Sequence, residues 1–122
     1  MRNKTLVVSV ADINTGTVQV INLVEQIPFE TRPSAFKTVT PSEMRLYNRT
    51  GCDLEYLLIT DDLEWTEYQA DPSLLFDFIR LTDGMWAHHH PMEKAIKLLV
   101  RKKSGTATAD LDVELIGYAN RG

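Results

Sequence analysis

Strict alternation of apolar and acidic residues near the C-terminus is the feature that most constrains the fold. Residues 109–116 are A-D-L-D-V-E-L-I, so Leu111, Val113 and Leu115 point to one side of an extended chain and the acidic residues to the other. An α-helix would distribute these residues around its circumference. The segment therefore predicts a β-strand with one buried side and one solvent-facing side.

An antiparallel hairpin is predicted between this strand and the segment just before it, residues 95–102. A turn centred on Ser104-Gly105, where glycine can adopt positive φ, pairs Leu98 with Leu111 and superimposes the two apolar faces. A slip of one residue would carry one of those faces to solvent, so we expect this register.

The same hairpin accounts for the charges on its solvent face. Carboxylates of the last strand would lie opposite cations of its neighbour, with Lys97 facing Asp112. The residues concerned are Asp110, Asp112, Glu114, Lys94, Lys97 and Arg101.

Further short strands are predicted along the chain, separated by turns at residues 14–16 and 48–51. They are residues 5–10, 17–24, 44–48 and 54–60. Residues 72–81 are ambiguous: Asp71-Pro72 is typical of a helix start and Gly84 of a helix end, whereas Phe76-Asp77-Phe78 alternates as a strand does. We favour a strand there, because the segment is short and aromatic.

About seven or eight short strands separated by Gly, Pro and Asn predict an all-β fold. We expect a single antiparallel β-sandwich or jelly-roll-like barrel that spans residues 1–122. A chain of 122 residues, 43% of them hydrophobic, can build a core without cross-links. Its only cysteine, Cys52, cannot form an intrachain disulfide and is expected to be a small, partly buried side chain.

Charge and hydropathy exclude two classes of partner. The net charge is −4, and acidic and basic residues are mixed along the chain, so there is no basic stripe for nucleic acid. No apolar segment is long enough to cross a bilayer or to form a signal-peptide core, so no membrane partner is expected. These observations predict synthesis in a cytoplasm.

The three histidines are consecutive, His88-His89-His90, and Glu93 follows them. Imidazoles and a carboxylate can bind a divalent metal, and His88 and His90 would share one face of a strand. Cupin-type metalloenzymes use the pattern Gly-x5-His-x-His-x3-4-Glu, but here only three residues separate Gly84 from His88 and two separate His90 from Glu93. We therefore favour a polar loop or an interface patch and expect no metal or other cofactor. The alternative is a metal site with His88, His90 and Glu93 as its ligands.

A second cluster combines carboxylates with aromatic residues: Asp61, Asp62, Glu64, Trp65, Glu67 and Tyr68. Such a combination can hydrolyse or bind sugars. In so small a chain, a solvated acidic turn after a strand is the favoured interpretation. Nucleophile elbows, phosphate-binding loops and paired Cys and His residues are absent from the sequence, so no enzymatic activity is predicted.

The order of segments resembles the small β-sandwich virion proteins of tailed bacteriophages, which include capsid cement or decoration proteins and related head or tail accessory proteins. The segments that carry the likeness are a lead-in with Pro28, Pro33 and Pro41, then residues 44–48, 50–56 and 76–78, and the closing residues 96–118. They cover about two-thirds of the chain. Residues 88–93 have no counterpart in that pattern.

The resemblance implies a non-enzymatic protein of the virion, present in many copies or as a homo-oligomer, that binds and stabilises neighbouring capsid subunits. Aromatic and arginine side chains in loops would make the contacts. The candidates are Arg32, Trp65, Tyr68, Trp86, His88, His89 and His90. The alternatives are a head-tail or tail accessory protein, a soluble carbohydrate- or ligand-binding β-domain with Trp65 and Tyr68 at its site, and a metal-dependent enzyme.

Overall fold

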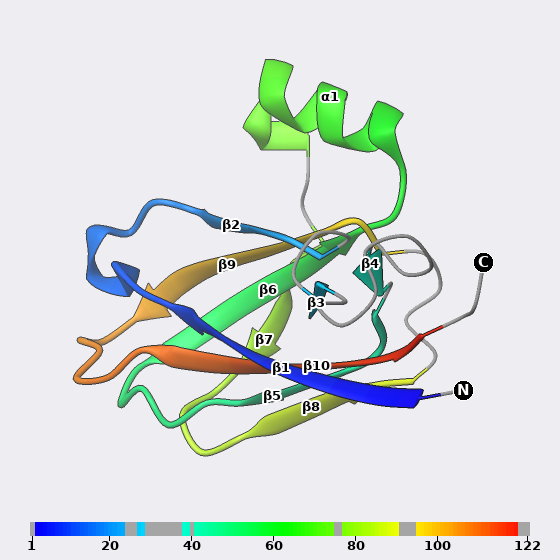
Figure 1. Ribbon diagram of the computed structural model, residues 1–122. Helices are drawn as coiled ribbons and strands as arrows, with labels where there is room; N and C mark the ends of the chain where they lie inside the picture. Colours follow the sequence, from blue (N-terminus) through cyan, green and yellow to red (C-terminus); the bar gives the residue numbers. More distant parts are fainter. Residues whose placement is uncertain are drawn as a thin grey trace.

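The computed structural model describes residues 2–23, 27–28, 38–39, 41–74, 77–90 and 95–119, and its elements are drawn in Figure 1. The strands are β1 (Arg2–Val10), β2 (Gln19–Asn22), β3 (Ile27–Pro28), β4 (Thr38–Val39), β5 (Pro41–Tyr47), β6 (Asp53–Ile59), β7 (Ile79–Leu81), β8 (Trp86–His89), β9 (Lys97–Ser104) and β10 (Leu111–Ala119). The helices are α1 (Asp62–Ala70) and two 3₁₀ turns, Ile13–Thr15 and Pro72–Leu74.

Two four-stranded antiparallel sheets form the body of the molecule, one in the order β1-β10-β5-β8 and the other in the order β2-β9-β6-β7. The first strand pairs with the last, β2 with β9, β5 with β8 and β6 with β7. This nested pairing is the strand order of a jelly roll. The expected all-β, sandwich-like class is therefore confirmed.

The core lies between the two sheets and is built from side chains that alternate along the strands. Leu46 of β5, Leu54 of β6, Leu98 of β9 and Leu115 of β10 belong to one buried cluster and are fully buried. Burial of each such leucine contributes about 2 kcal/mol relative to exposure. Cys52 is buried in the same cluster as a free thiol, as expected.

The expected hairpin between β9 and β10 is wrong, because the two strands belong to different sheets. Leu98 lies opposite Ile21 of β2 and Leu58 of β6, and Leu111 lies opposite Val10 of β1. The turn itself is present, with φ of +87° at Gly105, but it carries the chain from one sheet to the other. The two apolar faces do meet, across the core and not side by side.

The expected charge pairs across that hairpin are wrong for the same reason. Lys97 donates to the side-chain oxygen of Asn22, and Asp112 accepts a hydrogen bond from Ser9 at 3.0 Å. Arg101 instead pairs with Glu55 of β6, at 2.9 Å. The polar partners of Lys97 and Arg101 thus lie within their own sheet.

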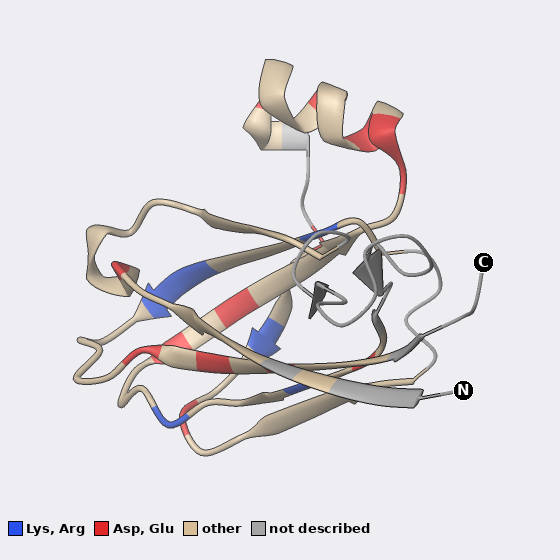
Figure 2. Cartoon of the chain, viewed as in Figure 1, with Lys and Arg blue, Asp and Glu red and all other residues tan. Residues whose placement is uncertain are grey.

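Helix α1 was not predicted and covers the outer side of the sheet β2-β9-β6-β7 (Figure 1). Asp61 caps its first turn by accepting a hydrogen bond from the backbone N–H of Leu63 at 2.7 Å. Acidic residues at a helix start are stabilised by the helix dipole, and Figure 2 marks this end of α1 red. The acidic segment is therefore a helix start, not the expected turn. Within the described residues, no helix has the length and apolar character needed to span a membrane.

The favoured strand over residues 72–81 is right only at its end. Asp71 caps a 3₁₀ turn by accepting from the backbone N–H and the hydroxyl of Ser73, at 3.1 and 2.6 Å, and the strand begins at Ile79. The proline that follows Asp71 favours such a turn, because its fixed φ suits the first helical position. Residues 75–76, which include Phe76, lie outside the described residues.

Candidate functional site

Exposed aromatic and charged side chains gather on the outer side of the sheet β1-β10-β5-β8. Along β5, Met44 and Leu46 point into the core, so Arg45 and Tyr47 point outwards. Strand pairing then sets the outward residues side by side in rows. We call this surface the front face and define it as Val7, Arg45, Tyr47, Arg49, Trp86, Asp110, Asp112 and Glu114.

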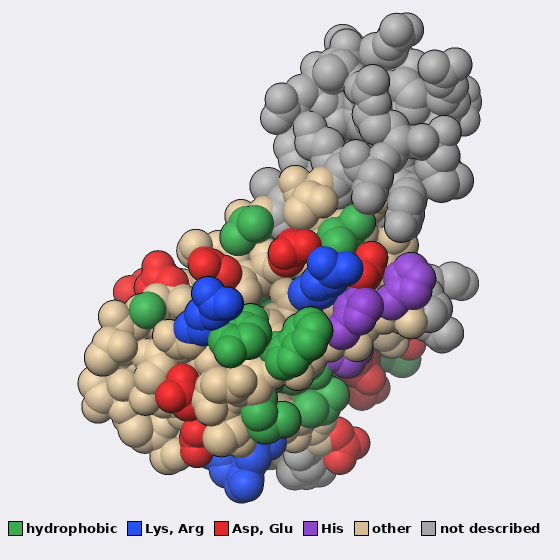
Figure 3. Space-filling view, turned by 90° about the horizontal axis from the view of Figure 1, so that it is seen from below, with side chains coloured by type: hydrophobic (Ala, Val, Ile, Leu, Met, Phe, Trp, Pro, Cys, Tyr) green, Lys and Arg blue, Asp and Glu red, His purple; other side chains and the backbone are tan. Residues whose placement is uncertain are grey.

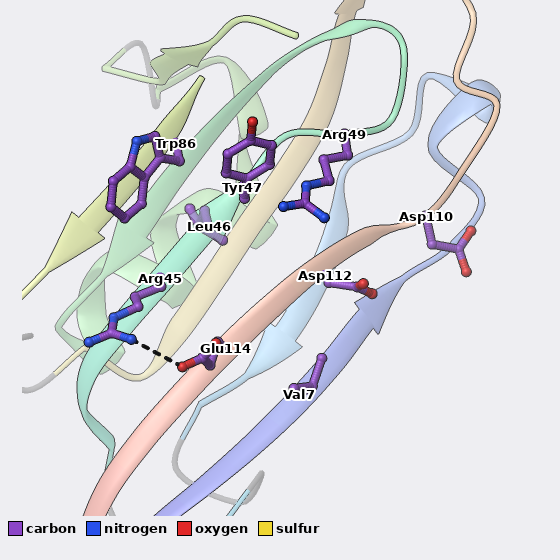
Figure 4. Close-up of a pocket in the computed structure, with 9 residues that line it drawn as sticks. All are labelled: Val7, Arg45, Leu46, Tyr47, Arg49, Trp86, Asp110, Asp112 and Glu114. Carbon is purple, nitrogen blue, oxygen red and sulfur yellow. Dashed lines mark hydrogen bonds and ion pairs between the residues drawn. The ribbon is translucent and has the colours of Figure 1, made fainter. Parts of the chain in front are cut away.

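Two rows run across the front face. In one, Trp86 of β8 lies opposite Tyr47 of β5, which lies opposite Asp112 of β10. In the next row, Arg45 of β5 lies opposite Glu114 of β10, which lies opposite Val7 of β1. The side chains of the front face and Leu46 line a groove of about 340 Å³ (Figure 4).

Aromatic side chains occupy one side of this groove and are open to solvent. Trp86 is 62% exposed and Tyr47 is 41% exposed. The guanidinium of Arg49 lies 4.3 Å from the centre of the Tyr47 ring, a cation–π contact that holds it beside the aromatic pair. Figure 3 looks onto this side of the molecule and shows hydrophobic side chains gathered among charged ones.

The charges of the front face are sorted by strand. The arginines, Arg45 and Arg49, come from β5 and the residues just after it, while Asp112 and Glu114 come from β10. The one ion pair between these columns is long, with Arg45 Nη1 and Glu114 Oε1 3.5 Å apart and both side chains well exposed. Such an exposed pair contributes little to stability. Within the same strand, Arg45 Nη2 also lies 3.1 Å from Oε1 of Glu43.

Next to the front face, two histidines share one carboxylate. His88 Nε2 lies 2.5 Å from Oε1 of Glu43, and His90 Nδ1 lies 3.9 Å from Oε2 of the same carboxylate. The rings of His88 and His90 stack at 6.2 Å, so the two do share a face, as the sequence predicts. The hydrogen bond from His88 holds the pKa of Glu43 below its ordinary value, aided by the nearby Arg45 and opposed by burial.

The middle histidine points the other way. His89 Nε2 and the hydroxyl of Tyr56 lie 2.6 Å apart, and the Tyr56 side chain is in the core. Burial lowers the pKa of His89, with the positive charge of His88 as a smaller cause, and burial raises the pKa of Tyr56. His89 therefore joins the two sheets and is turned away from the front face.

The lowered pKa of Glu43 predicts a specific dependence of stability on pH. Its folded-state pKa lies below the ordinary value of 4.5, so the ionised carboxylate stabilises the fold above that pH and this contribution is lost as the pH falls further. We expect the urea midpoint of the wild type to fall more steeply than that of Glu43→Gln between about pH 4.5 and pH 3. Parallel curves for the two proteins would contradict the assignment.

Of the alternative metal site at His88, His90 and Glu93, the structure describes the two histidines. Glu93 lies outside the described residues, and the carboxylate that His88 and His90 face is Glu43. Among the residues that the structure places, no three His, Cys, Asp or Glu side chains are grouped so as to hold a metal ion.

The other partner-binding candidates separate into two places. Trp86 is on the front face, whereas Trp65 and Tyr68 of α1 stack on each other at 5.7 Å and pack over Ile59 and Leu99. This second, smaller core leaves Tyr68 buried, so these rings attach the helix to the sheet. Arg32 lies outside the described residues.

Sequence reasoning missed Arg45, Tyr47 and Arg49, although a signal was present. Residues 43–47 are E-M-R-L-Y, which alternates polar and apolar side chains as clearly as the last strand does. Alternation at this point predicts that the charged and aromatic residues face solvent. Alternation does not identify the neighbouring strand, since Trp86 follows only after two further strands, β6 and β7, with α1 and a 3₁₀ turn between them.

Comparison with known proteins adds no relative. No protein-family model, no curated protein and no solved structure matches this chain.

Proposed function

We propose that this protein is a non-enzymatic structural protein of a tailed-bacteriophage virion, a capsid cement or decoration protein that binds and stabilises neighbouring capsid subunits, with its front face as an assembly contact. The observation that supports this proposal most is the solvent-exposed group of Trp86, Tyr47 and Arg49 on an otherwise well-packed sheet. Tryptophan, tyrosine and arginine are the residues that most often dominate binding at protein interfaces.

The rest of the front face has the composition of an interface. Val7 is 57% exposed at the far edge of the same groove, which widens the apolar area beyond the aromatic pair. Charged side chains surround these residues and would form a polar rim. Exposed apolar surface rimmed by polar groups is typical of a protein contact site.

The jelly-roll interior supports a binding role over a catalytic one. In the described part of the chain, the space between the sheets is filled by apolar side chains such as Leu46, Leu98 and Val113. His88 and His90, the residues on which a metal-dependent enzyme would depend, point to the outside. Chemistry inside the barrel would need room that these side chains occupy.

A carbohydrate-binding domain is the second candidate, and the groove itself favours it. Two aromatic rings, two guanidinium groups and three carboxylates line about 340 Å³, a combination that can stack on a sugar ring and bond its hydroxyls. This places the candidate sugar site at Trp86 and Tyr47, in place of Trp65 and Tyr68. A role at the head-tail junction or tail would use the same face on a different subunit.

A particle-binding experiment tests the main proposal. Wild-type protein added to virions from which it has been removed is expected to rebind, and a cryo-electron microscopy map should show the front face buried in a contact on the capsid shell. Trp86→Ala is expected to weaken rebinding about 30-fold, since an interface tryptophan contributes about 2 kcal/mol or more. Leu63→Ala is the matched control, because Leu63 is exposed on α1 at the opposite side.

The outcomes separate the candidates. Density at a tail or at the head-tail junction would assign the protein a role there. The second candidate would be favoured if the protein does not bind particles but binds a glycan specifically, and if Trp86→Ala abolishes that binding. If Trp86→Ala rebinds as tightly as wild type, the front face is not the assembly contact.

A further inference from the structure

The charge columns of the front face are arranged to fit a second copy of the same chain. At the end of β5, Arg49 extends the column that begins with Arg45, and before the start of β10, Asp110 extends the column of carboxylates. The register pairs Arg45 with Glu114 and Tyr47 with Asp112, where the ladder ends. Arg49 and Asp110 lie beyond that end of the ladder and line the same groove. Basic and acidic columns therefore run side by side along neighbouring strands (Figure 4).

A two-fold axis determines which columns meet when two such faces come together. If the axis lies in the interface, parallel to the strands and between β5 and β10, rotation exchanges the two columns while it keeps each row in place. The arginines of one copy then lie over the carboxylates of the other: Arg49 over Asp110 and Arg45 over Glu114. An axis across the strands would instead place arginine over arginine, which is unfavourable.

The apolar residues obey the same symmetry. Trp86 is on β8, at one edge of the sheet, and Val7 is on β1, at the opposite edge. Rotation about the strand-parallel axis brings β8 of each copy over β1 of the other, so Trp86 lies over Ser9, the β1 residue of its own row, and the exposed Val7 lies in the next row. The charges thus select one arrangement, in which each copy contributes the same contacts, as expected for an isologous interface.

We propose that the front face is the dimer interface of this protein, formed with a second copy about a two-fold axis parallel to the strands. The inference deepens the proposed function, because it names a second copy of the chain as the partner of the front face. It rests on the proposed function only for the premise that the front face serves assembly. Each copy contributes the same contacts, so every substitution in the interface acts twice.

Sedimentation equilibrium of wild type, two variants and a mixture of the two variants tests the dimer. Wild type is expected to dimerise, and Arg49→Glu and Asp110→Lys are each expected to dimerise at least about 10-fold more weakly, because each places like charges across both contacts. Mixing the two variants is expected to restore the dimer. In the mixed pair, Glu at 49 faces Lys at 110, and the native Asp110 faces the native Arg49, so both contacts join opposite charges.

Restoration by mixing separates a lost contact from a misfolded variant, and circular dichroism of each variant confirms the fold. Wild type that remains a monomer up to about 1 mM, or a mixture no more dimeric than its components, overturns the inference. A dimer in solution with no place on a particle would leave it standing while the virion role fails. Particle-bound protein whose front face contacts only a capsid subunit would overturn the dimer and leave the virion role standing.

Discussion

Replacing Asn48 by Asp is expected to lower the free energy of unfolding by about 3 kcal/mol or more, which is a large part of the stability of a small domain. Asn48 is fully buried at the end of β5, and its amide group donates to the carbonyl oxygens of Cys52 and Leu81, at 2.8 and 2.7 Å. Its side-chain oxygen accepts from the backbone N–H and the hydroxyl of Thr50. One side chain thus joins three segments of the chain.

The substitution to Asp keeps the shape of the side chain and removes both donors. The carbonyl oxygens of Cys52 and Leu81 would lose their partners and face a carboxylate, and a buried group without its hydrogen bond costs about 1–3 kcal/mol. Urea unfolding monitored by tryptophan fluorescence measures the loss. Arg49→Ala, at the exposed neighbouring position, is the control and is expected to stay within about 0.5 kcal/mol of wild type. An equally small effect at Asn48 would contradict the structural role.

Replacing Leu99 by Ala is expected to cost about 2–4 kcal/mol and to loosen helix α1 selectively. Leu99 is fully buried, but it points away from the main core and packs with Ile59 and Tyr68 beneath the helix. Removal of its side chain leaves a cavity in the small cluster that holds α1 on the sheet. Hydrogen exchange of the α1 amides should therefore accelerate more than exchange in β10.

Two control variants test whether the effect of Leu99→Ala on α1 is specific to the small cluster beneath the helix. Leu98→Ala removes a side chain of equal size from the main core, so a similar loss of stability is expected without a selective change in α1. Leu63→Ala changes an exposed position of α1 and is expected to have little effect on either quantity. Uniform acceleration of exchange across the molecule in Leu99→Ala would show that the helix does not depend on the small cluster.

The sequence predicts which side of a strand is buried far better than it predicts which strand lies alongside. Leu111, Val113 and Leu115 are buried as their alternation indicates. Yet β9 and β10 never pair, because a short turn can join strands of two facing sheets as readily as strands of one sheet. Alternation depends on local backbone geometry, whereas partners depend on segments far apart in the chain.

Helix α1 shows a different limit. Among its nine residues only Tyr68 is buried, so the apolar stripe that identifies an amphipathic helix is nearly absent. The stronger signal was in β9, where Leu98, Leu99 and Val100 are consecutive apolar residues. A strand that is apolar on both sides is covered on both sides, which predicts a helix or a second layer over its outer face.

The candidate site was predictable in part. The shared face of His88 and His90 follows from strand geometry alone, and it is confirmed. Their carboxylate partner was expected at Glu93, close in sequence, but the structure supplies Glu43 from the neighbouring strand β5. Tyr47 and Trp86 meet for the same reason, through pairing of β5 with β8.

The nested strand order also brings the two ends of the fold together. Arg2 lies opposite Ala119 in the ladder between β1 and β10, so the chain enters and leaves the sheet at one corner (Figure 1). Paired residues in such a ladder are about 5 Å apart. A peptide or fluorescent domain fused to either end would emerge from the same point, and cargo fused to both ends would be held as neighbours.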